Sequence, residues 1–365
     1  MRQADGVRID VADVAALERG VAVLGSGGGG DSRTAATLLR RRLASGLDIA
    51  VHPIADLPPD AWIVPVGVVG ATAVFTEKLP GGHEFAAAVG AVERWTGTRA
   101  DALVSIEIGG LNGVMPLVAA CDLGLSTVDA DLSGRGLPRL DQLSLGAAGR
   151  PVVPAALAEP SGQVLLQATG APGDLERMAR AFLPSAGGWA MLALAPIRAR
   201  ELAACAVVAS VSSALWLGRQ VLALGESPDP ARLAAATNGR VLALGRVAEV
   251  TRRPGPELHG RAGFARGSVT LADHASGALL RLEMENEYLL ALRDGLVVAS
   301  TPDVLAVLDR RTAVPIACDT VRPGMEVMVL QLAISPFWTH PGRLDVLAPR
   351  AYGIDCDPAL LGTGR

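Results

Sequence analysis

Aromatic residues are scarce in this chain, at 3% of 365 residues, and charged residues make up only 19%. Half of the residues are hydrophobic, so the chain has enough apolar material for a substantial core, and it is not intrinsically disordered. A core of small aliphatic side chains suits helices packed closely on a sheet. The length predicts one large domain or two moderate ones.

An excess of positive charge is also lacking. The formal net charge is −4, and no stripe of basic residues of the kind that neutralises phosphates is visible. The run Arg40-Arg41-Arg42 is short and falls on a predicted helix, where a solvated face explains it. We therefore expect no nucleic acid among the partners of this protein.

Export and membrane signals are missing as well. The first residues contain no apolar core and no small-residue cleavage site. The most apolar stretch, residues 202–224, is interrupted by polar side chains such as Arg219, which fits a buried helix better than a membrane span. These features predict a cytoplasmic protein with no membrane association.

The sequence lacks the common short motifs of metal, thiol and hydrolase chemistry. Its four cysteines form no C-x-x-C pair, so their spacing predicts neither a zinc site nor a disulfide framework, and buried reduced thiols are expected. H-x-H, H-E-x-x-H and G-x-S-x-G do not occur. Their absence argues against an amidohydrolase barrel, a zincin and an α/β-hydrolase, respectively.

The first half of the chain alternates between strand-like and helix-like segments, which predicts an α/β domain with a mostly parallel sheet. The expected strands are residues 21–24, 49–54, 62–69, 103–106 and 127–130, and the expected helices are residues 11–18, 32–43, 83–95 and 116–123.

After about residue 165 the pattern changes to short strands separated by turn residues. The expected strands include residues 163–168, 240–250, 267–272, 278–284, 296–300, 326–334 and 344–346, with a helical stretch over residues 175–183 and 191–222. We therefore predict two domains, an α/β domain over residues 1–165 and a β-rich (α+β) domain with a helical insertion over residues 166–365.

A run of glycines at residues 25–31 (GSGGGGD) is the first candidate for ligand binding. Glycines let the backbone approach a ligand closely, and the N–H groups at the start of the following helix attract anions. We expect Gly27, Gly28, Gly29, Gly30 and Asp31 to bind substrate. The run also satisfies G-x-G-x-x-G, but no acidic residue closes the second predicted strand, so a dinucleotide site is not favoured. The missing G-K-[ST] excludes a P-loop.

A second cluster, Glu107-Ile108-Gly109-Gly110-Leu111-Asn112, follows directly on a predicted strand. Ligands of open α/β sheets bind in the crevice beyond the carboxyl ends of the strands. Glu107 is a candidate general base or metal ligand, or alternatively a buried acid satisfied by backbone N–H groups. Asn112 is grouped with it as a catalytic candidate, and Gly109 and Gly110 as substrate-binding ones.

A third cluster contains Asp129, Asp131 and Arg135. The two acids are two residues apart, so they share one face of the chain if the strand stays regular. Arg135 is either an anchor for a substrate carboxylate or a salt-bridge partner of one of these aspartates. Lys78, in Glu77-Lys78, is a weaker candidate for substrate binding, and Glu285-Asn286-Glu287 is a further polar cluster.

Eight segments together resemble one known family. They are GSGGGGD (25–31), VPVGVVGATAVFTEKLPGG (64–82), EIGGLNGVMPLVAA (107–120), VDADLSGRGLP (128–138), SVSSALWLGRQV (210–221), ENEYLLA (285–291), TPDVL (301–305) and APRAYGID (348–355). In their order and approximate spacing they resemble the S-methyl thiohydantoin desulfurase family, formerly a family of unknown function. The resemblance extends over nearly the whole chain. It departs from the usual pattern at Leu132-Ser133, Gly136-Leu137 and Ala71-Thr72.

The resemblance implies a hydrolase that acts on a hydantoin-like five-membered ring at its S-methyl carbon and releases methanethiol. It implies an α/β N-terminal and a β-rich C-terminal domain, and association with a hydantoinase- or oxoprolinase-type partner protein. In this interpretation Glu107 or Asp129 is the general base, Asp131 protonates the ring or holds a divalent metal ion, and Arg135 or the glycine run binds the substrate. No ligand spacing demands a metal.

Two alternatives remain open at the level of the sequence. One is a nucleotide-binding protein that uses the glycine run, and the other is a non-catalytic subunit of a hydantoinase-type enzyme. A homo-oligomer is expected from the size of the chain alone.

Overall fold

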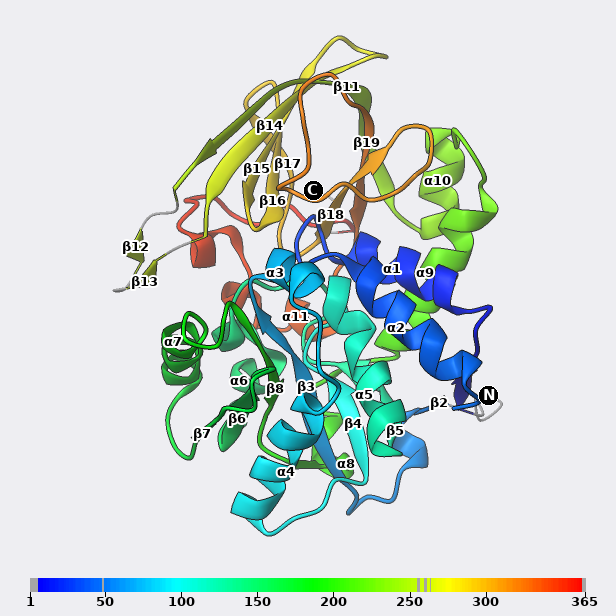
Figure 1. Ribbon diagram of the computed structural model, residues 1–365. Helices are drawn as coiled ribbons and strands as arrows, with labels where there is room; N and C mark the ends of the chain where they lie inside the picture. The colour runs from blue at the N-terminus through cyan, green and yellow to red at the C-terminus, as the bar shows by residue number, and fades with distance from the viewer. Residues whose placement is uncertain (1–5, 48, 255–256, 259–260, 263, 363–365) are drawn as a thin grey trace.

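The N-terminal part of the protein is built on a mixed sheet whose four central strands are parallel, as a computed structural model shows (Figure 1). The structure describes residues 6–47, 49–254, 257–258, 261–262 and 264–362. The strand order is β1-β2-β5-β4-β3-β8-β6-β7, with β10 beside β5 and β9 beside β3. Strands β2, β5, β4 and β3 are parallel and the outer pairings are antiparallel. The bounds are β1 Val7–Ile9, β2 Ile49–His52, β3 Trp62–Gly70, β4 Ala102–Ser105, β5 Ser126–Asp131, β6 Ala155–Ala158, β7 Val164–Gln167, β8 Trp189–Ala193, β9 Ile197–Arg198 and β10 Val207–Val208.

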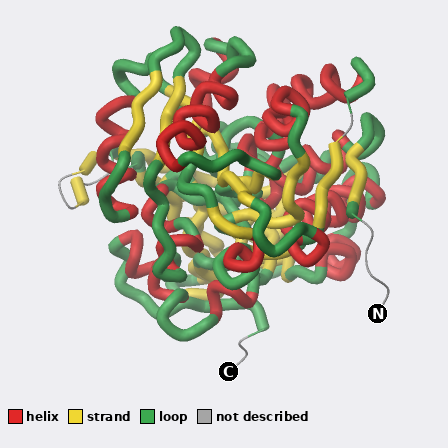
Figure 2. The backbone as a smooth tube through the Cα atoms, turned by 90° about the horizontal axis from the view of Figure 1, so that it is seen from below, coloured by secondary structure: helices red, strands yellow, loops and turns green. Residues whose placement is uncertain are grey.

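Helices cover both faces of this sheet (Figure 2). Alternate side chains of β3 point to opposite faces, as a strand requires: Val64, Val66 and Val68 belong to one apolar core and Ile63 to the other. The first core contains side chains of α1 (Val14–Leu24), α2 (Ser32–Ala44), α4 (Glu84–Thr96), α5 (Met115–Leu123) and α9 (Ser210–Ala223). The second contains side chains of α6 (Ser144–Ala147), α7 (Pro172–Phe182) and α8 (Ala199–Leu202).

The C-terminal part forms a second, antiparallel sheet. Its order is β17-β16-β15-β14-β11-β19-β18, and its alternating buried side chains form a separate apolar core. The bounds are β11 Arg240–Arg253, β14 Arg266–Asp273, β15 Leu279–Glu285, β16 Glu287–Arg293, β17 Leu296–Ser300, β18 Val304–Asp309 and β19 Glu326–Leu332, with a separate hairpin of β12 Glu257–Leu258 and β13 Arg261–Ala262. Helix α10 (Pro230–Thr237) packs on β11 and β19. Helix α11 (Pro336–Thr339) lies against the loop after β5, where Nε1 of Trp338 donates to the carbonyl of Ser133 at 2.6 Å. The predicted fold class, an α/β domain followed by a β-rich domain, is therefore confirmed.

Three predicted elements are wrong. Residues 21–24 belong to α1 and not to a strand, because a short apolar run cannot distinguish a strand from the buried face of a helix. The predicted helix over residues 191–222 is wrong in its first part, which contains the end of β8, then β9, α8 and β10. Only its last part forms a long helix, α9. Residues 344–346 form a short 3-10 helix instead of a strand.

Strand β8 lies between β3 and β6, although β6 precedes it in the chain by some thirty residues. Helix α9 likewise packs on α1, and glycines make the approach close: a Cβ on Gly20 would lie 1.8 Å from the carbonyl oxygen of Ala214. The predicted domains, residues 1–165 and 166–365, are therefore not separate in space. Strands β8, β9 and β10 from the second stretch belong to the N-terminal sheet.

In the part of the chain that the structure describes, no helix is both long enough and apolar enough to span a lipid bilayer.

Candidate functional site

A cleft of about 940 Å³ lies where the two sheets meet. One wall is formed by the glycine run, the ends of β3 and β4 and the loop that follows β5. The opposite wall comes from the C-terminal sheet and its loops, including Arg252, Phe264, Asn286 and Asp319. The cleft thus adjoins the carboxyl ends of parallel strands, where open α/β sheets bind ligands.

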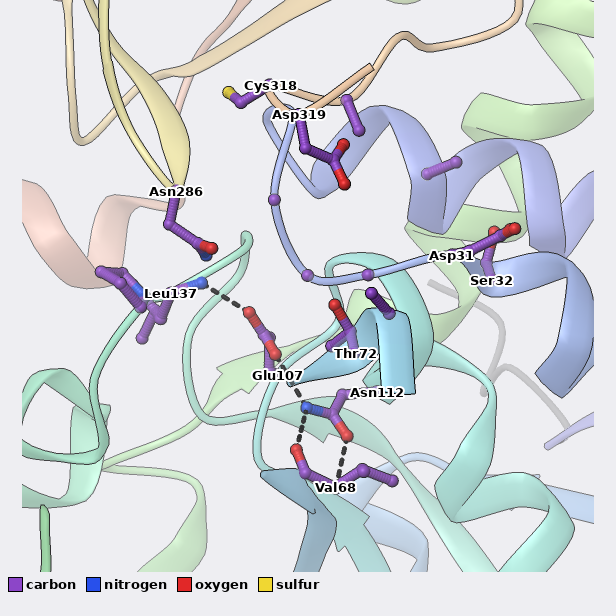
Figure 3. Close-up of a pocket in the computed structure, with 18 of the residues that line it drawn as sticks. Asp31, Ser32, Val68, Thr72, Glu107, Asn112, Leu137, Asn286, Cys318 and Asp319 are labelled. Carbon is purple, nitrogen blue, oxygen red and sulfur yellow. Dashed lines mark hydrogen bonds between the residues drawn. The ribbon is translucent and has the colours of Figure 1, made fainter. Parts of the chain in front are cut away.

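Glu107 enters this cleft two residues after β4 (Figure 3). Its Oε1 accepts a hydrogen bond of 2.5 Å from the backbone N–H of Leu137, and its Oε2 accepts one of 2.8 Å from Nδ2 of Asn112. Burial disfavours the charged form and raises the pKa of Glu107 to about 7, against the opposing effect of these hydrogen bonds. A carboxyl group that is partly ionised at neutral pH can both accept and return a proton.

Asn112 fixes the position of the Glu107 carboxyl group. It lies on a short 3-10 helix, Gly110–Gly113, and is itself buried. Its Oδ1 accepts from the N–H of Val68 at 2.6 Å, and its Nδ2 donates to the carbonyl of Val68 at 3.0 Å. These two bonds tie the amide to β3, so the remaining N–H can only point at Glu107.

The glycine run, which we call the glycine loop (residues 25–31), connects α1 to α2 and lines the cleft with Gly27, Gly28, Gly29, Gly30 and Asp31. Because a helix precedes it, the strand–loop–helix arrangement of a dinucleotide-binding turn is not found here. Asp31 caps α2 by accepting from the N–H of Arg33 at 2.9 Å. The loop lies where the glycine pattern predicted it, but the element before it is a helix and not the predicted strand.

Both sheets hold the glycine loop in place. On the C-terminal side, the buried hydroxyl of Ser26 donates to the carbonyl of Leu305 at 3.0 Å, and the carbonyl of Gly27 accepts from the N–H of Cys318 at 2.9 Å. On the N-terminal side, the carbonyl of Gly29 accepts from the N–H of Leu111 at 2.8 Å. The loop is therefore a fixed wall of the cleft.

Gly109 and Gly110 do not line the cleft but support the glycine loop from behind. A Cβ on Gly110 would lie 2.3 Å from the carbonyl oxygen of Gly29, and a Cβ on Gly109 would lie 2.3 Å from the nitrogen of Gly136. The absence of side chains at these two positions lets three backbone segments pack against one another.

Asp129 and Asp131, both at the end of β5, are buried outside the cleft. Asp129 accepts hydrogen bonds from the N–H groups of Val211 and Ser212, at 3.0 Å each, and so binds the start of α9.

Oδ2 of Asp131 accepts from Ile108 N at 2.8 Å, Ser133 N at 3.0 Å and Gly134 N at 2.8 Å. Burial raises the pKa of Asp131 to about 6, although these bonds oppose the rise. Asp131 thus ties the turn that carries Glu107 to the turn after β5.

Arg135 and Lys78 also lie outside the cleft. The guanidinium of Arg135 is fully buried, and the hydrogen bonds of Asp129 and Asp131 come from backbone N–H and serine groups instead of from Arg135. Its Nη1 donates to Thr301 Oγ1 at 3.0 Å and to the carbonyls of Pro302 and Asp303 at 2.9 and 2.8 Å. It therefore joins the N-terminal domain to the turn between β17 and β18. Lys78 instead donates to the carbonyl of Ala186 and pairs with Glu159 at 3.6 Å.

No sequence motif pointed to the residues that the C-terminal domain contributes to the cleft. Arg252, Phe264 and Asp319 follow no motif and are brought to Glu107 only by the packing of the two sheets. Asn286 lay within a polar cluster noted in the sequence, but nothing there connected it to Glu107.

The cysteines and the side chains that could bind a metal ion were also considered in the sequence. Within the described residues, none of the four cysteines forms a disulfide, and Cys121, Cys205 and Cys318 are buried. Among the residues that the structure describes, no group of three or more His, Cys, Asp or Glu side chains is placed to hold a metal ion.

Comparison with known proteins gives two matches that together extend over almost the entire sequence. Residues 12–169 match the S-Me-THD-like N-terminal domain, and residues 171–360 match the S-Me-THD-like C-terminal domain. A crystal structure of a protein from Chromobacterium violaceum is similar, with a TM-score of 0.76 and 23% sequence identity, over 97% of this chain and 100% of that one. This likeness shows a shared fold. No curated protein matches the sequence.

Proposed function

Because this chain belongs to the S-Me-THD-like family through both of its domains, we propose that it hydrolyses a hydantoin-like ring at an S-methyl carbon and releases methanethiol. The observation that carries the proposal is the Glu107 carboxyl group in the interdomain cleft, buried and held by Asn112 and Leu137. Its raised pKa suits a group that takes a proton from water near neutral pH.

In the proposed reaction, water adds to the ring carbon that bears the S-methyl group. Glu107 accepts one proton of that water as the new C–O bond forms, and this proton passes to the ring nitrogen of the former C=N bond. The tetrahedral intermediate then collapses: the C–S bond breaks, the hydroxyl group loses its proton to form the carbonyl, and the leaving sulfur takes up that proton. The products are a hydantoin and methanethiol, so atoms and protons balance.

The glycine loop supplies the second element of the proposal, the binding of the substrate. Gly28 to Gly30 present backbone to the cleft with no side chain in the way, at the start of α2, where N–H groups favour negative charge. Apolar side chains such as Ile106 and Leu137 share the same wall. A small ring with a polar edge and an S-methyl group fits such a mixed lining.

Methanethiol release from an S-methyl thiohydantoin tests the proposal directly. We expect release by the wild-type protein, and a loss of about 10²–10⁴-fold in kcat for Glu107→Gln. Glu18→Gln is the matched control, because Glu18 also borders the cleft but pairs with Arg40. Pretreatment with EDTA tests the alternative in which Asp131 holds a divalent metal ion.

Absence of methanethiol with every S-methylated ring tested would overturn the proposed reaction. Activity that arises only after addition of a hydantoinase-type protein would instead support the alternative of a partner subunit. The homo-oligomer remains a prediction from the size of the chain, and sedimentation of the same preparation would test it.

A further inference from the structure

Asn286 is a polar side chain of the cleft that the proposed reaction does not use. It forms the tight turn between β15 and β16, where Glu285 pairs with Glu287. Its φ of +63° is in the left-handed region, which asparagine tolerates better than most side chains do. The turn carries the side chain into the cleft from the C-terminal domain, and its amide points toward Leu137 and Glu107 (Figure 3).

Glu287 holds this amide in one orientation. Nδ2 of Asn286 donates to Oε1 of Glu287 at 2.6 Å. The Glu287 side chain is fully buried and lies against the glycine loop, since a Cβ on Gly28 would be only 2.3 Å from Oε1. Burial, reinforced by the charge of Glu107 and opposed by that of Arg135, raises the pKa of Glu287 to about 8. The group is therefore mostly neutral at pH 7 and accepts through its carbonyl oxygen.

The orientation leaves the rest of the Asn286 amide to the cleft. A primary amide has two N–H groups and one carbonyl oxygen. One N–H is engaged by Glu287, and within the described part of the chain Oδ1 of Asn286 has no hydrogen-bond partner. One N–H donor and one acceptor oxygen of this amide are thus left for a ligand across the cleft from Glu107.

We propose that Asn286 recognises the amide edge of the substrate ring. Its Oδ1 accepts from a ring N–H and its second Nδ2–H donates to the adjacent ring carbonyl, which is the pairing that two amide edges make with each other. This inference rests on the proposed function, because it takes the ligand to be a cyclic amide. It adds a substrate-contacting residue from the C-terminal domain to the site built around Glu107.

The arrangement also explains why the cleft needs both domains. Glu107 and Asn112 come from the end of β4 and the segment after it, whereas Asn286 comes from the β15–β16 turn. A ring held by Asn286 along one edge is fixed in the plane of that amide. Its S-methyl carbon can then be presented to the water that Glu107 activates, which is the positioning that orientation effects in catalysis require.

The test measures binding of plain hydantoin, which carries no S-methyl group, by calorimetry. Asn286→Gly removes the amide and keeps the left-handed backbone without strain. We expect it to weaken hydantoin binding by about tenfold or more, as the loss of one or two hydrogen bonds implies. Asn238→Gly is the matched control, because Asn238 has a φ of +53° at the end of α10, outside the cleft, and should bind as the wild type does.

A ligand change makes the test specific to the ring edge. Hydantoin methylated on the nitrogen between its two carbonyls lacks the N–H that Oδ1 would accept from. We expect methylation to weaken binding to the wild type by a similar factor and to have little further effect on Asn286→Gly. Equal losses on methylation in both proteins would overturn the inference.

The binding data separate this inference from the proposed reaction. Methanethiol release together with unchanged hydantoin binding by Asn286→Gly would leave the reaction standing and overturn the role of Asn286. Binding that depends on Asn286, without methanethiol release from any substrate, would support ring recognition and overturn the reaction.

Discussion

Glu107 is stabilised by neutral hydrogen-bond donors, an amide and a backbone N–H. Such donors favour the carboxylate less than a contacting cation would, so burial dominates and the pKa rises to about 7. Asn112 cannot turn away, because β3 holds both ends of its amide. Asn112 thus sets the position of the proposed base, whereas burial sets its basicity.

The pH dependence of turnover should report on this group. A general base must be deprotonated, so kcat/KM for methanethiol release should rise as the pH increases through about 7 and level off above it. Initial rates between about pH 5 and about pH 9 would show the midpoint. A flat profile over that range would mean that Glu107 does not act as the base.

The candidate residues show what a single sequence can and cannot predict at this scale. Glu107, Asn112 and the glycine loop were located because a strand end and a run of glycines are local signals. The roles of Asp129 and Arg135 could not be read in the same way, since α9 and the β17–β18 turn, which bind them, are far away in the chain. The role of Asn286 could not be predicted for the same reason, because it lies on the opposite wall of the cleft and is far from Glu107 in the chain.

At the scale of the elements, Asp129 acts as the cap of α9 rather than as part of the cleft. Asp129→Ala should therefore cost about 0.5–2 kcal/mol of stability, as lost helix caps do, with most of the turnover retained. Asp229→Ala is the matched control, because Asp229 caps α10 in the same manner, through the N–H groups of Ala231 and Arg232. Urea unfolding and methanethiol release, measured on both variants, would check this. A selective loss of more than about 10²-fold in kcat for Asp129→Ala would identify it as the base instead.

The glycine loop provides a comparison between two glycines with almost equal backbone angles. Gly27 has a φ of +87° and Gly46 a φ of +88°, but a Cβ on Gly27 would lie 2.4 Å from the ring of Tyr288, whereas Gly46 has nothing within 4 Å. Gly46→Ala should cost only about 1 kcal/mol of backbone strain. Gly27→Ala should cost about 1–3 kcal/mol more from overpacking and should lower turnover, because the wall of the cleft is displaced. Thermal unfolding and turnover of the two variants would measure the difference, and equal behaviour would show that the loop is not clamped.

The sequence predicted the four parallel strands β2, β3, β4 and β5, and also β7, because their apolar runs are bounded by glycines, prolines and polar residues. It did not predict the short strands β1, β6, β9 and β10. It failed at residues 21–24, where four apolar residues complete the buried face of α1 and periodicity over so short a run is uninformative. It also failed at β8, whose residues follow a helix and precede a largely helical stretch.

At the scale of the whole molecule, several carboxyl groups are buried around the junction of the two sheets. Burial raises the pKa of Glu107 to about 7, of Asp131 to about 6 and of Glu287 to about 8. Between the ordinary pKa of an acid and these values, the folded protein binds more protons than the unfolded chain. The free energy of unfolding should therefore fall as the pH rises from about 5 to about 8.

Urea unfolding at several pH values would check this slope. Glu287→Gln removes one titrating group, so its stability should fall less steeply with pH than that of the wild type, whatever its absolute stability. Glu226→Gln is the control, since Glu226 is exposed and pairs with the exposed Arg311. An unchanged slope in Glu287→Gln would show that Glu287 is not protonated in the folded protein.

The place of β8 between β3 and β6 has a consequence for the synthesis of this protein. The β6–β7 hairpin leaves the ribosome before β8 does, yet β8 is the strand that connects it to β3. Until residue 193 has been made, both β3 and β6 carry an open edge of unpaired backbone groups. A nascent chain that pauses after residue 169, where the first family match ends, is therefore exposed to aggregation. It depends on continued translation, or on a chaperone, to protect those edges.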